Sequence, residues 1–236
     1  MNRRQSLGQH FLVSDSIAKS IVDFAKITKN DTVLEIGTGK GILIPFLCQA
    51  AKNVISVERD RELYLLAQQK YSSFSNLNLK HGDAFEMNVD FTVLVSNLPY
   101  SKSRDAIEWL IQKKFRVAII MVQKEFAQKL LSKLGAKNHR AISVLVNYSA
   151  GIEPLMEVSK LNFFPAPKVD SIVLRLTKKH NMSKKIIDSI NKLFSYRRKT
   201  IHNIAKQFRV SIDSNKRLED LTDGEIIKLA KEINRN

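Results

Sequence analysis

The chain has 236 residues, 44% of them hydrophobic, which is enough for one large domain, or one domain with a small appendage, around an ordinary buried core. With 39 Lys and Arg against 23 Asp and Glu, the formal net charge is +16, so the expected partner is a polyanion, with nucleic acid ahead of an anionic membrane surface. We find no run of about 18 apolar residues, no secretory signal and no lipidation motif, so we expect no membrane partner and a cytoplasmic protein.

Short apolar runs alternate with longer amphipathic runs through the first three quarters of the chain. The expected strands are 32–36, 53–57, 77–80, 92–96, 117–122, 142–149 and 171–176. The expected helices are 15–25, 42–51, 61–69, 104–112 and 124–133. This alternation is typical of an α/β fold with a mostly parallel sheet.

The apolar spacing changes near residue 183. Beyond it, apolar residues recur at helical intervals over 186–194 and 201–208, and a last helix is expected over 223–233. Residues 178–236 hold 15 Lys and Arg against 7 Asp and Glu, a net +8 of the total +16. We therefore predict two domains: a sheet domain over 1–178 and a small basic helical domain over 179–236, suited to clamping nucleic acid unless its charges form only a solvated face.

A glycine-rich turn, Glu35 to Gly41, follows the first expected strand and indicates a nucleotide-like cofactor. A dinucleotide site would need a third Gly where Ile42 stands, and a phosphate loop would need Ser or Thr after its Gly-Lys. Glu58 ends the second strand and could bind ribose hydroxyls, and Asp83 follows the third strand and could accept an adenine amine. S-adenosylmethionine therefore fits better than NAD, although Glu58 could be a surface residue and Asp83 a helix N-cap.

The segment Asn97-Leu98-Pro99-Tyr100 follows the strand expected over 92–96. The Asn97 amide and the Leu98 carbonyl can accept hydrogen bonds from an exocyclic NH2, while Pro99 has no N–H and a fixed φ. Tyr100 offers a surface on which a flipped base can stack. The segment predicts chemistry on an adenine or cytosine amine, and the alternative is a strand followed by an ordinary turn.

Metal chemistry is not expected. The single cysteine, Cys48, excludes a disulfide within the chain and a cysteine-cluster site, and its apolar surroundings suggest a buried thiol. The five His residues show no metal-ligand spacing.

Taken together, the motifs resemble the KsgA/RsmA (Dim-type) family of small-subunit rRNA adenine N6,N6-dimethyltransferases along nearly the whole chain. The motifs that carry the resemblance are Leu7 to Leu12, Glu35 to Gly41, Val57-Glu58, Gly82-Asp83-Ala84, Asn97 to Tyr100, Gln123 to Ala127, Phe163 to Ser171 and Phe194 to Thr200. The form of the Asn97 motif and the compact tail look more archaeal than bacterial.

The resemblance implies a Rossmann-like S-adenosylmethionine-dependent methyltransferase sheet and assigns roles to individual residues. It implies cofactor contacts by His10, Leu12, Gly37, Glu58, Asp83 and Asn97, and catalysis by Asn97, Leu98, Pro99 and Tyr100. Phe163 is expected to face the target adenine opposite Tyr100, although Phe164 stands beside it. For contacts with rRNA phosphates the candidates are Lys168, Arg197, Arg198 and Lys199.

The implied function is dimethylation of two adjacent adenines near the 3′ end of small-subunit rRNA, within a pre-ribosomal particle and by a monomer. Three alternatives stay open: a large-subunit rRNA dimethyltransferase of the macrolide-resistance type, a ribosome-assembly factor with weak or lost catalysis, and a nicotinamide-dependent oxidoreductase. The missing third glycine and the charge of +16 argue against the last.

Overall fold

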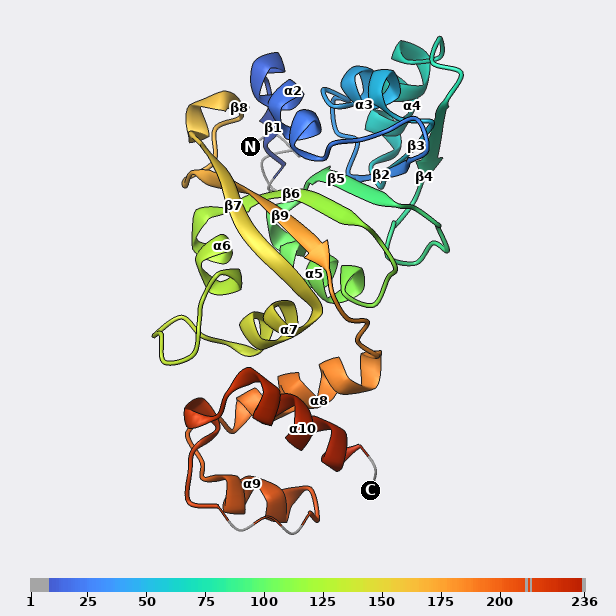
Figure 1. Cartoon of the computed structure of the whole chain (residues 1–236). Helices are drawn as coiled ribbons and strands as arrows, with labels where there is room; N and C mark the ends of the chain where they lie inside the picture. The colour runs from blue at the N-terminus through green and yellow to red at the C-terminus, as the bar shows by residue number, and fades with distance from the viewer. Residues whose placement is uncertain (1–8, 211, 213, 235–236) are drawn as a thin grey trace. The chain divides into compact units, whose positions relative to one another are not determined.

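The structure is a computed structural model that describes residues 9–210, 212 and 214–234 (Figure 1). Leu7 and Gly8 of the first motif lie outside these residues. The described chain divides into two compact units. Unit 1 holds the residues up to Ala106, then 114–127 and 153–177, and unit 2 holds 107–113, 128–152 and the residues from Lys178 onward. Unit 2 thus includes two segments from before the predicted boundary at 178/179.

A seven-stranded sheet has the order β4-β3-β2-β5-β6-β9-β7 (Figure 1). The strands are β2 (Thr32–Ile36), β3 (Asn53–Glu58), β4 (Leu77–His81), β5 (Val93–Asn97), β6 (Val117–Gln123), β7 (Ala150–Val158) and β9 (Ser171–Lys178). β2 to β6 pair in parallel, and β9 runs antiparallel to β6. The α/β fold is confirmed, and the strand order reverses between β3-β2 and β5, which is where ligands of such sheets bind.

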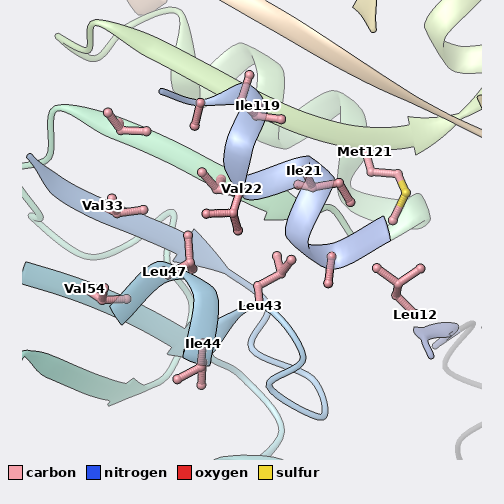
Figure 2. Close-up of a cluster of buried hydrophobic side chains, with 14 of the residues drawn as sticks. Leu12, Ile21, Val22, Val33, Leu43, Ile44, Leu47, Val54, Ile119 and Met121 are labelled. Carbon is pink, nitrogen blue, oxygen red and sulfur yellow. The ribbon is translucent and has the colours of Figure 1, made fainter. Parts of the chain in front are cut away.

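Helices alternate with the parallel strands, as predicted. They are α2 (Asp15–Phe24), α3 (Ile44–Ala50), α4 (Arg61–Lys70), α5 (Ser103–Leu110) and α6 (Lys124–Leu130). Figure 2 shows α2 and α3 packed on one face of the sheet, with Ile21 and Leu47 against side chains from the strands. Among those side chains are Val33, Val54 and Ile119. Parallel strands covered by helices read as near-continuous apolar runs, which is why they could be recognised in the sequence.

The strand predicted over 142–149 is wrong. These residues form α7 (Ala141–Ser149), and the strand β7 (Ala150–Val158) follows it. All residues from Ala141 to Val146 are buried, and a short apolar run buried on every side carries no periodicity that separates helix from strand. β7 was missed because it contains Gly151 and Pro154, which lower strand propensity but are tolerated at the edge of a sheet, where β7 lies.

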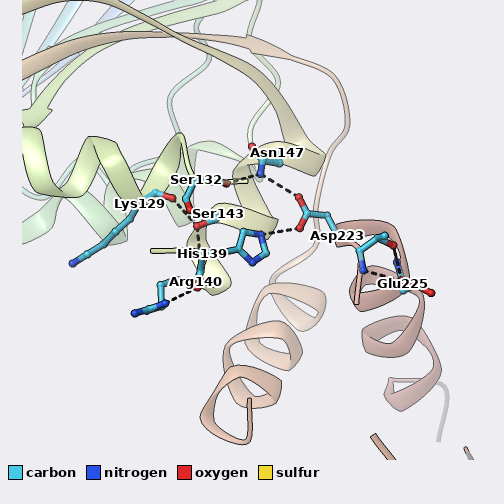
Figure 3. A network of polar contacts seen from close by, with 9 residues as sticks. Lys129, Ser132, His139, Arg140, Ser143, Asn147, Asp223 and Glu225 are labelled. Carbon is cyan, nitrogen blue, oxygen red and sulfur yellow. Dashed lines mark hydrogen bonds and ion pairs between the residues drawn. The ribbon is translucent and has the colours of Figure 1, made fainter. Parts of the chain in front are cut away.

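Unit 2 contains the predicted C-terminal helices, which are confirmed as α8 (Lys184–Ser195), α9 (Ile201–Gln207) and α10 (Asp223–Ile233), with a 3-10 turn η3 (Leu218–Asp220). α10 begins with a capping box, in which Thr222 and Glu225 each bond the other's backbone N–H. Figure 3 shows Asp223 accepting hydrogen bonds from His139 and Asn147, at 3.0 and 3.1 Å. These bonds tie the first turn of α10 to α7 and the segment before it.

Two short strands lie outside the main sheet and were not predicted. β1 (Phe11–Leu12) pairs antiparallel with β8 (Phe163–Phe164), preceded by a 3-10 turn η2 (Lys160–Asn162). Strands of two residues are too short to leave a pattern in the sequence. None of the described helices has both the length and the apolar composition needed to cross a membrane.

Candidate active site

An open pocket of about 760 Å³, which includes space continuous with solvent, lies at the carboxyl ends of β2, β3 and β5 in unit 1. Four stretches of chain line it: the segment through β1, the turn after β2, the end of β3 with the start of α4, and the segment after β5. The lining residues are Gln9 to Leu12, Glu35, Gly37 to Lys40, Ile42, Leu43, Glu58, Leu63 and Asn97 to Tyr100. The pocket is therefore at the switch point of the sheet.

The glycine-rich turn after β2 depends on backbone conformations that suit glycine. Gly37, Gly39 and Gly41 have φ values of +81°, +57° and +74°. A Cβ on Gly39 would come 3.2 Å from the Phe11 ring, and one on Gly41 would come 2.3 Å from the Tyr71 ring. Glycine is thus required here for close packing as well as for conformation.

Glu58 is held in a fixed orientation at the end of β3. One carboxylate oxygen accepts from the Gly39 N–H and the other from the Asp60 N–H, both at 2.8 Å. The residue is 5% exposed, so it is not the surface glutamate that the alternative reading allowed. A carboxylate oxygen has two lone pairs, so each can still accept a hydroxyl from a ligand.

Glu35 adds a second buried carboxyl group to the pocket. Its pKa is raised to about 8, mainly by burial and to a smaller extent by the nearby Glu58, while the hydrogen bond from Ser56 acts in the opposite direction. Ser56 also bonds Thr38, at 2.6 Å. Glu35 is therefore mainly protonated at neutral pH.

Asn97 presents an unpaired acceptor to the pocket. It ends β5, and its Oδ1 is buried without a hydrogen-bond partner among the described residues. Gln9 also lines the pocket, and its Oε1 is likewise buried without a hydrogen-bond partner among the described residues. A buried acceptor without a partner costs free energy, so these two oxygens fit a ligand that brings N–H or O–H donors.

Tyr100 and His10 form an aromatic pair at the pocket. Their ring centroids are 5.6 Å apart, with 30° between the planes. The Tyr100 hydroxyl bonds the Ser171 hydroxyl at 2.8 Å, and burial raises the pKa of Tyr100, so the phenol is neutral at physiological pH. His10 Nδ1 lies 2.7 Å from the Pro165 carbonyl, and because a carbonyl only accepts, Nδ1 carries the proton. A hydrogen bond therefore holds each ring in place: Tyr100 is bonded to Ser171, and His10 is bonded to the Pro165 carbonyl.

Most of the predicted cofactor residues converge on the pocket. His10, Leu12, Gly37, Glu58 and Asn97 all line it, as do Leu98, Pro99 and Tyr100. Asp83 is not among the lining residues. Its carboxylate accepts from the Phe85 N–H at 3.0 Å and lies 3.8 Å from Arg59, in the turn that follows β4.

Phe163, which is expected to lie against the target adenine opposite Tyr100, is not among the residues that line the pocket. The strands β1 and β8 form a two-stranded ribbon in which Phe163 pairs with Leu12. Both side chains are 3% exposed and belong to the hydrophobic core. Phe164 pairs with Phe11 and is 66% exposed. Successive side chains of a strand point to opposite faces, so burying Phe163 brings Phe164 to the surface.

The basic candidates are not among the residues that line the pocket. Lys168 is an exposed residue of the loop between β8 and β9. Arg197, Arg198 and Lys199 lie between α8 and α9 in unit 2, and the Lys199 ammonium is 5.0 Å from the Tyr196 ring centroid. Cys48 is buried, as expected, and no group of His, Cys, Asp or Glu among the described residues is arranged to hold a metal.

Several lining residues were not singled out from the sequence. Gln9 and Phe11 stand inside the first motif, so their positions next to His10 were the available signal. Leu43 and Leu63 gave none, because a buried leucine at a helix start looks the same in any α/β protein.

Comparison with known proteins identifies the family. A family model described as ribosomal RNA adenine dimethylase matches residues 1–235. The chain belongs to that family. A ribosomal RNA small subunit methyltransferase A from Clostridium botulinum is 34% identical over 253 residues, covering 96% of this chain and 92% of that protein.

Two further relatives of this dimethylase-family chain extend the comparison. A probable ribosomal RNA small subunit methyltransferase A from Methanococcus aeolicus is 35% identical over 239 residues, covering 97% of this chain and 88% of that protein. The crystal structure of a dimethyladenosine transferase from Plasmodium falciparum has a TM-score of 0.81 at 28% identity, covering 95% of this chain and 98% of that one. Bacterial and archaeal relatives are equally similar, so the archaeal resemblance is not distinctive.

Proposed function

We propose that this chain dimethylates the N6 amines of two adjacent adenines near the 3′ end of small-subunit rRNA, with S-adenosylmethionine as methyl donor. The observation that carries the proposal is the Asn97 Oδ1, a buried acceptor without a partner at the end of β5, in a chain that matches the rRNA adenine dimethylase model over residues 1–235. The relatives named as small subunit methyltransferases favour the small subunit over the large one.

The cofactor occupies the turn side of the pocket in this proposal. Glu58, oriented by two backbone N–H groups, accepts from the ribose hydroxyls, and Gly37 lets the backbone approach the ligand. His10 and Leu12 close the pocket from the side of β1. Asp83, in the turn after β4, binds the adenine amine of the cofactor. When bound, S-adenosylmethionine supplies an electrophilic methyl group on a sulfonium.

The Asn97 segment prepares the substrate amine. The lone pair of an adenine amine is delocalised into the ring, so it is a poor nucleophile. Acceptors at the Asn97 amide and the Leu98 carbonyl hold the two N–H groups so that the nitrogen becomes more pyramidal, and this effect is greatest in the transition state. Pro99 rigidifies this backbone, and the methylated ammonium then loses its proton to solvent.

Tyr100 holds the target base in this account. Its hydroxyl is fixed by Ser171, and its ring plane is fixed beside His10, so the stacking surface is set before the base arrives. Pre-ordering a ring in this way lowers the entropy cost of binding a flipped base. The resemblance also gives Phe163 a place against the adenine, whereas in this structure its ring is buried in the core.

The wider context of the reaction is part of the same proposal. The substrate is the small-subunit rRNA in a pre-ribosomal particle, the enzyme acts as a monomer in the cytoplasm, and Lys168, Arg197, Arg198 and Lys199 contact phosphates. Their support is the charge of +16 and the exposed positions of Lys168, Arg198 and Lys199.

The experiment is transfer of radiolabelled methyl groups to under-methylated small subunits, large subunits and naked rRNA, followed by nucleoside analysis. The proposal predicts label in N6,N6-dimethyladenosine of small subunits. Label in large subunits alone would replace it with the macrolide-resistance activity, and tight small-subunit binding without label would indicate an assembly factor that has lost its chemistry.

A further inference from the structure

The ribbon formed by β1 and β8 has one buried face and one exposed face. Leu12 and Phe163 make the buried pair, and Phe11 and Phe164 are the pair on the opposite side. The pairing continues beyond the strands, since the Val13 N–H donates to the Asn162 carbonyl at 2.9 Å. Cross-strand partners lie side by side on one face, so Phe164 is fixed beside Phe11, a residue of the pocket lining.

Lys40 connects this face of the ribbon to the pocket. Its ammonium lies 5.3 Å from the centroid of the Phe11 ring and 5.6 Å from that of Phe164. Both distances are within the range of a cation–π contact, so the ammonium lies over both rings. Lys40 also lines the pocket, which puts a positive charge and an exposed ring at its mouth.

Large hydrophobic side chains are exposed in and beside the ribbon. Among the described residues, the strongly exposed large hydrophobic side chains include Leu161 at 79%, Phe164 at 66% and Val13 at 53%. These three belong to, or directly adjoin, the paired segments. Exposed apolar groups that cluster beside a ligand pocket mark an interaction surface, whereas scattered ones do not.

The charged residues near the ribbon indicate which class of partner this surface binds. Lys160 and Lys168 are exposed on the two sides of Phe164 in the chain, in addition to Lys40. Asp170 is the nearby acidic residue of the same loop, and it accepts from the Lys160 N–H at 2.9 Å. Aromatic rings among lysines are the combination that binds single-stranded nucleic acid, because the rings stack on bases and the ammonium groups contact phosphates.

We propose that Phe164 and Lys40 form an RNA-binding rim at the pocket mouth, in which Phe164 stacks on an unpaired base next to the methylated adenine and Lys40 contacts its phosphate. The proposal rests on the proposed function, which supplies an RNA substrate. It also gives the two phenylalanines different roles: Phe163 packs in the core beneath the ribbon, and Phe164 contacts RNA.

The test is equilibrium binding of a fluorescein-labelled single-stranded RNA with two adjacent adenines to the full chain, read by anisotropy. Phe164→Ala should weaken RNA binding by about 5-fold to about 100-fold, the range expected for loss of one base–aromatic stack. Phe164→Trp should restore binding to within about twofold, whereas Phe164→Leu should not. Calorimetric affinity for S-adenosylmethionine should be unchanged in all three variants.

A matched control is Leu66→Ala, which removes a side chain that is 56% exposed on α4, and it should leave RNA binding unchanged. Lys40→Gln should make the dependence of log K on log salt shallower by about 0.7, the value for one phosphate of a single strand.

Unchanged RNA binding in Phe164→Ala would overturn the proposal. Restoration by Leu as complete as that by Trp would also overturn it, because the side chain would then act through apolar contact and not by stacking on a base. Because the assay measures binding without methyl transfer, a wild-type chain that binds RNA through Phe164 but methylates none would contradict the proposed function and leave this inference standing.

Discussion

Glu35 illustrates how folding changes the chemistry of a single residue. In the unfolded chain its carboxyl group titrates near its ordinary pKa of 4.5, whereas burial and the neighbouring Glu58 raise that pKa to about 8 in the fold. Between these two pH values the folded state keeps a proton that the unfolded state has lost. The free energy of unfolding therefore falls as pH rises from about 4.5 to about 8.

Glu35→Gln should remove this part of the pH dependence. The amide has the shape of the protonated acid and does not titrate, so the variant should resemble the wild type near pH 5 and exceed its stability at pH 8 by roughly 1–3 kcal/mol. Urea denaturation at a series of pH values measures the difference. Parallel pH–stability curves for the two proteins would show that Glu35 is ionised in the fold.

At the scale of elements, the turn from β2 to α3 is specified by steric exclusion. Gly41→Ala should destabilise the fold by about 2–4 kcal/mol, because the residue has φ of +74° and its Cβ would come 2.3 Å from the Tyr71 ring. Gly224→Ala is the control. No atom lies within 4 Å of that Cβ, and alanine favours a helix, so stability should rise by up to about 1 kcal/mol. Equal denaturation midpoints for the two variants would contradict the argument.

The attachment of α10 within unit 2 depends on Asp223. Burial would raise the pKa of this carboxyl group, but hydrogen bonds from His139 and Asn147 bring it below its ordinary value of 3.8 (Figure 3). Since a lowered pKa stabilises the ionised form, the contribution is present at neutral pH and is lost as pH falls below about 4.

Asp223→Ala should therefore cost about 1–3 kcal/mol at pH 7, and less at pH 3. Thermal unfolding at both pH values measures the loss. Asp188→Ala, at an exposed position on α8, is the control and should change stability by less than about 0.5 kcal/mol. A cost for Asp223→Ala that is independent of pH would show that packing, not charge, holds α10.

The helices and strands also show which parts of the fold could be predicted from sequence patterns. β2, β3, β5 and β6 could be predicted because helices cover the parallel strands and make them continuously apolar. α7 and β7 could not, since α7 is buried on every side and β7 has Gly151 and Pro154 at an edge position. At the site, the residues at strand ends, such as Glu58 and Asn97, were predictable from topology. The burial of Phe163 and the exposure of Phe164 could not be predicted, because they depend on a strand of only two residues.

On the scale of the whole molecule, the charge of +16 should dominate affinity for RNA. Replacing Arg197, Arg198 and Lys199 together with Ala should weaken RNA binding and make the dependence of log K on log salt shallower by about 2–3, if each contacts one phosphate. Titrations at several salt concentrations measure the slope.

The control removes three exposed lysines elsewhere, Lys52, Lys70 and Lys114, and lowers the net charge by the same amount. It should change the slope much less. If both triple variants give the same slope, the segment between α8 and α9 acts through net charge alone and is not a clamp.

The measurement that tests the central claim most directly is the rate of methyl transfer by Asn97→Ala on a substrate that the wild type dimethylates, with S-adenosylmethionine binding measured separately by calorimetry. Losing the acceptor that polarises the amine should lower kcat by at least about 10²-fold, while binding of the cofactor stays measurable. Near-normal turnover in this variant would contradict the role assigned to Asn97 and, with it, the proposed mechanism.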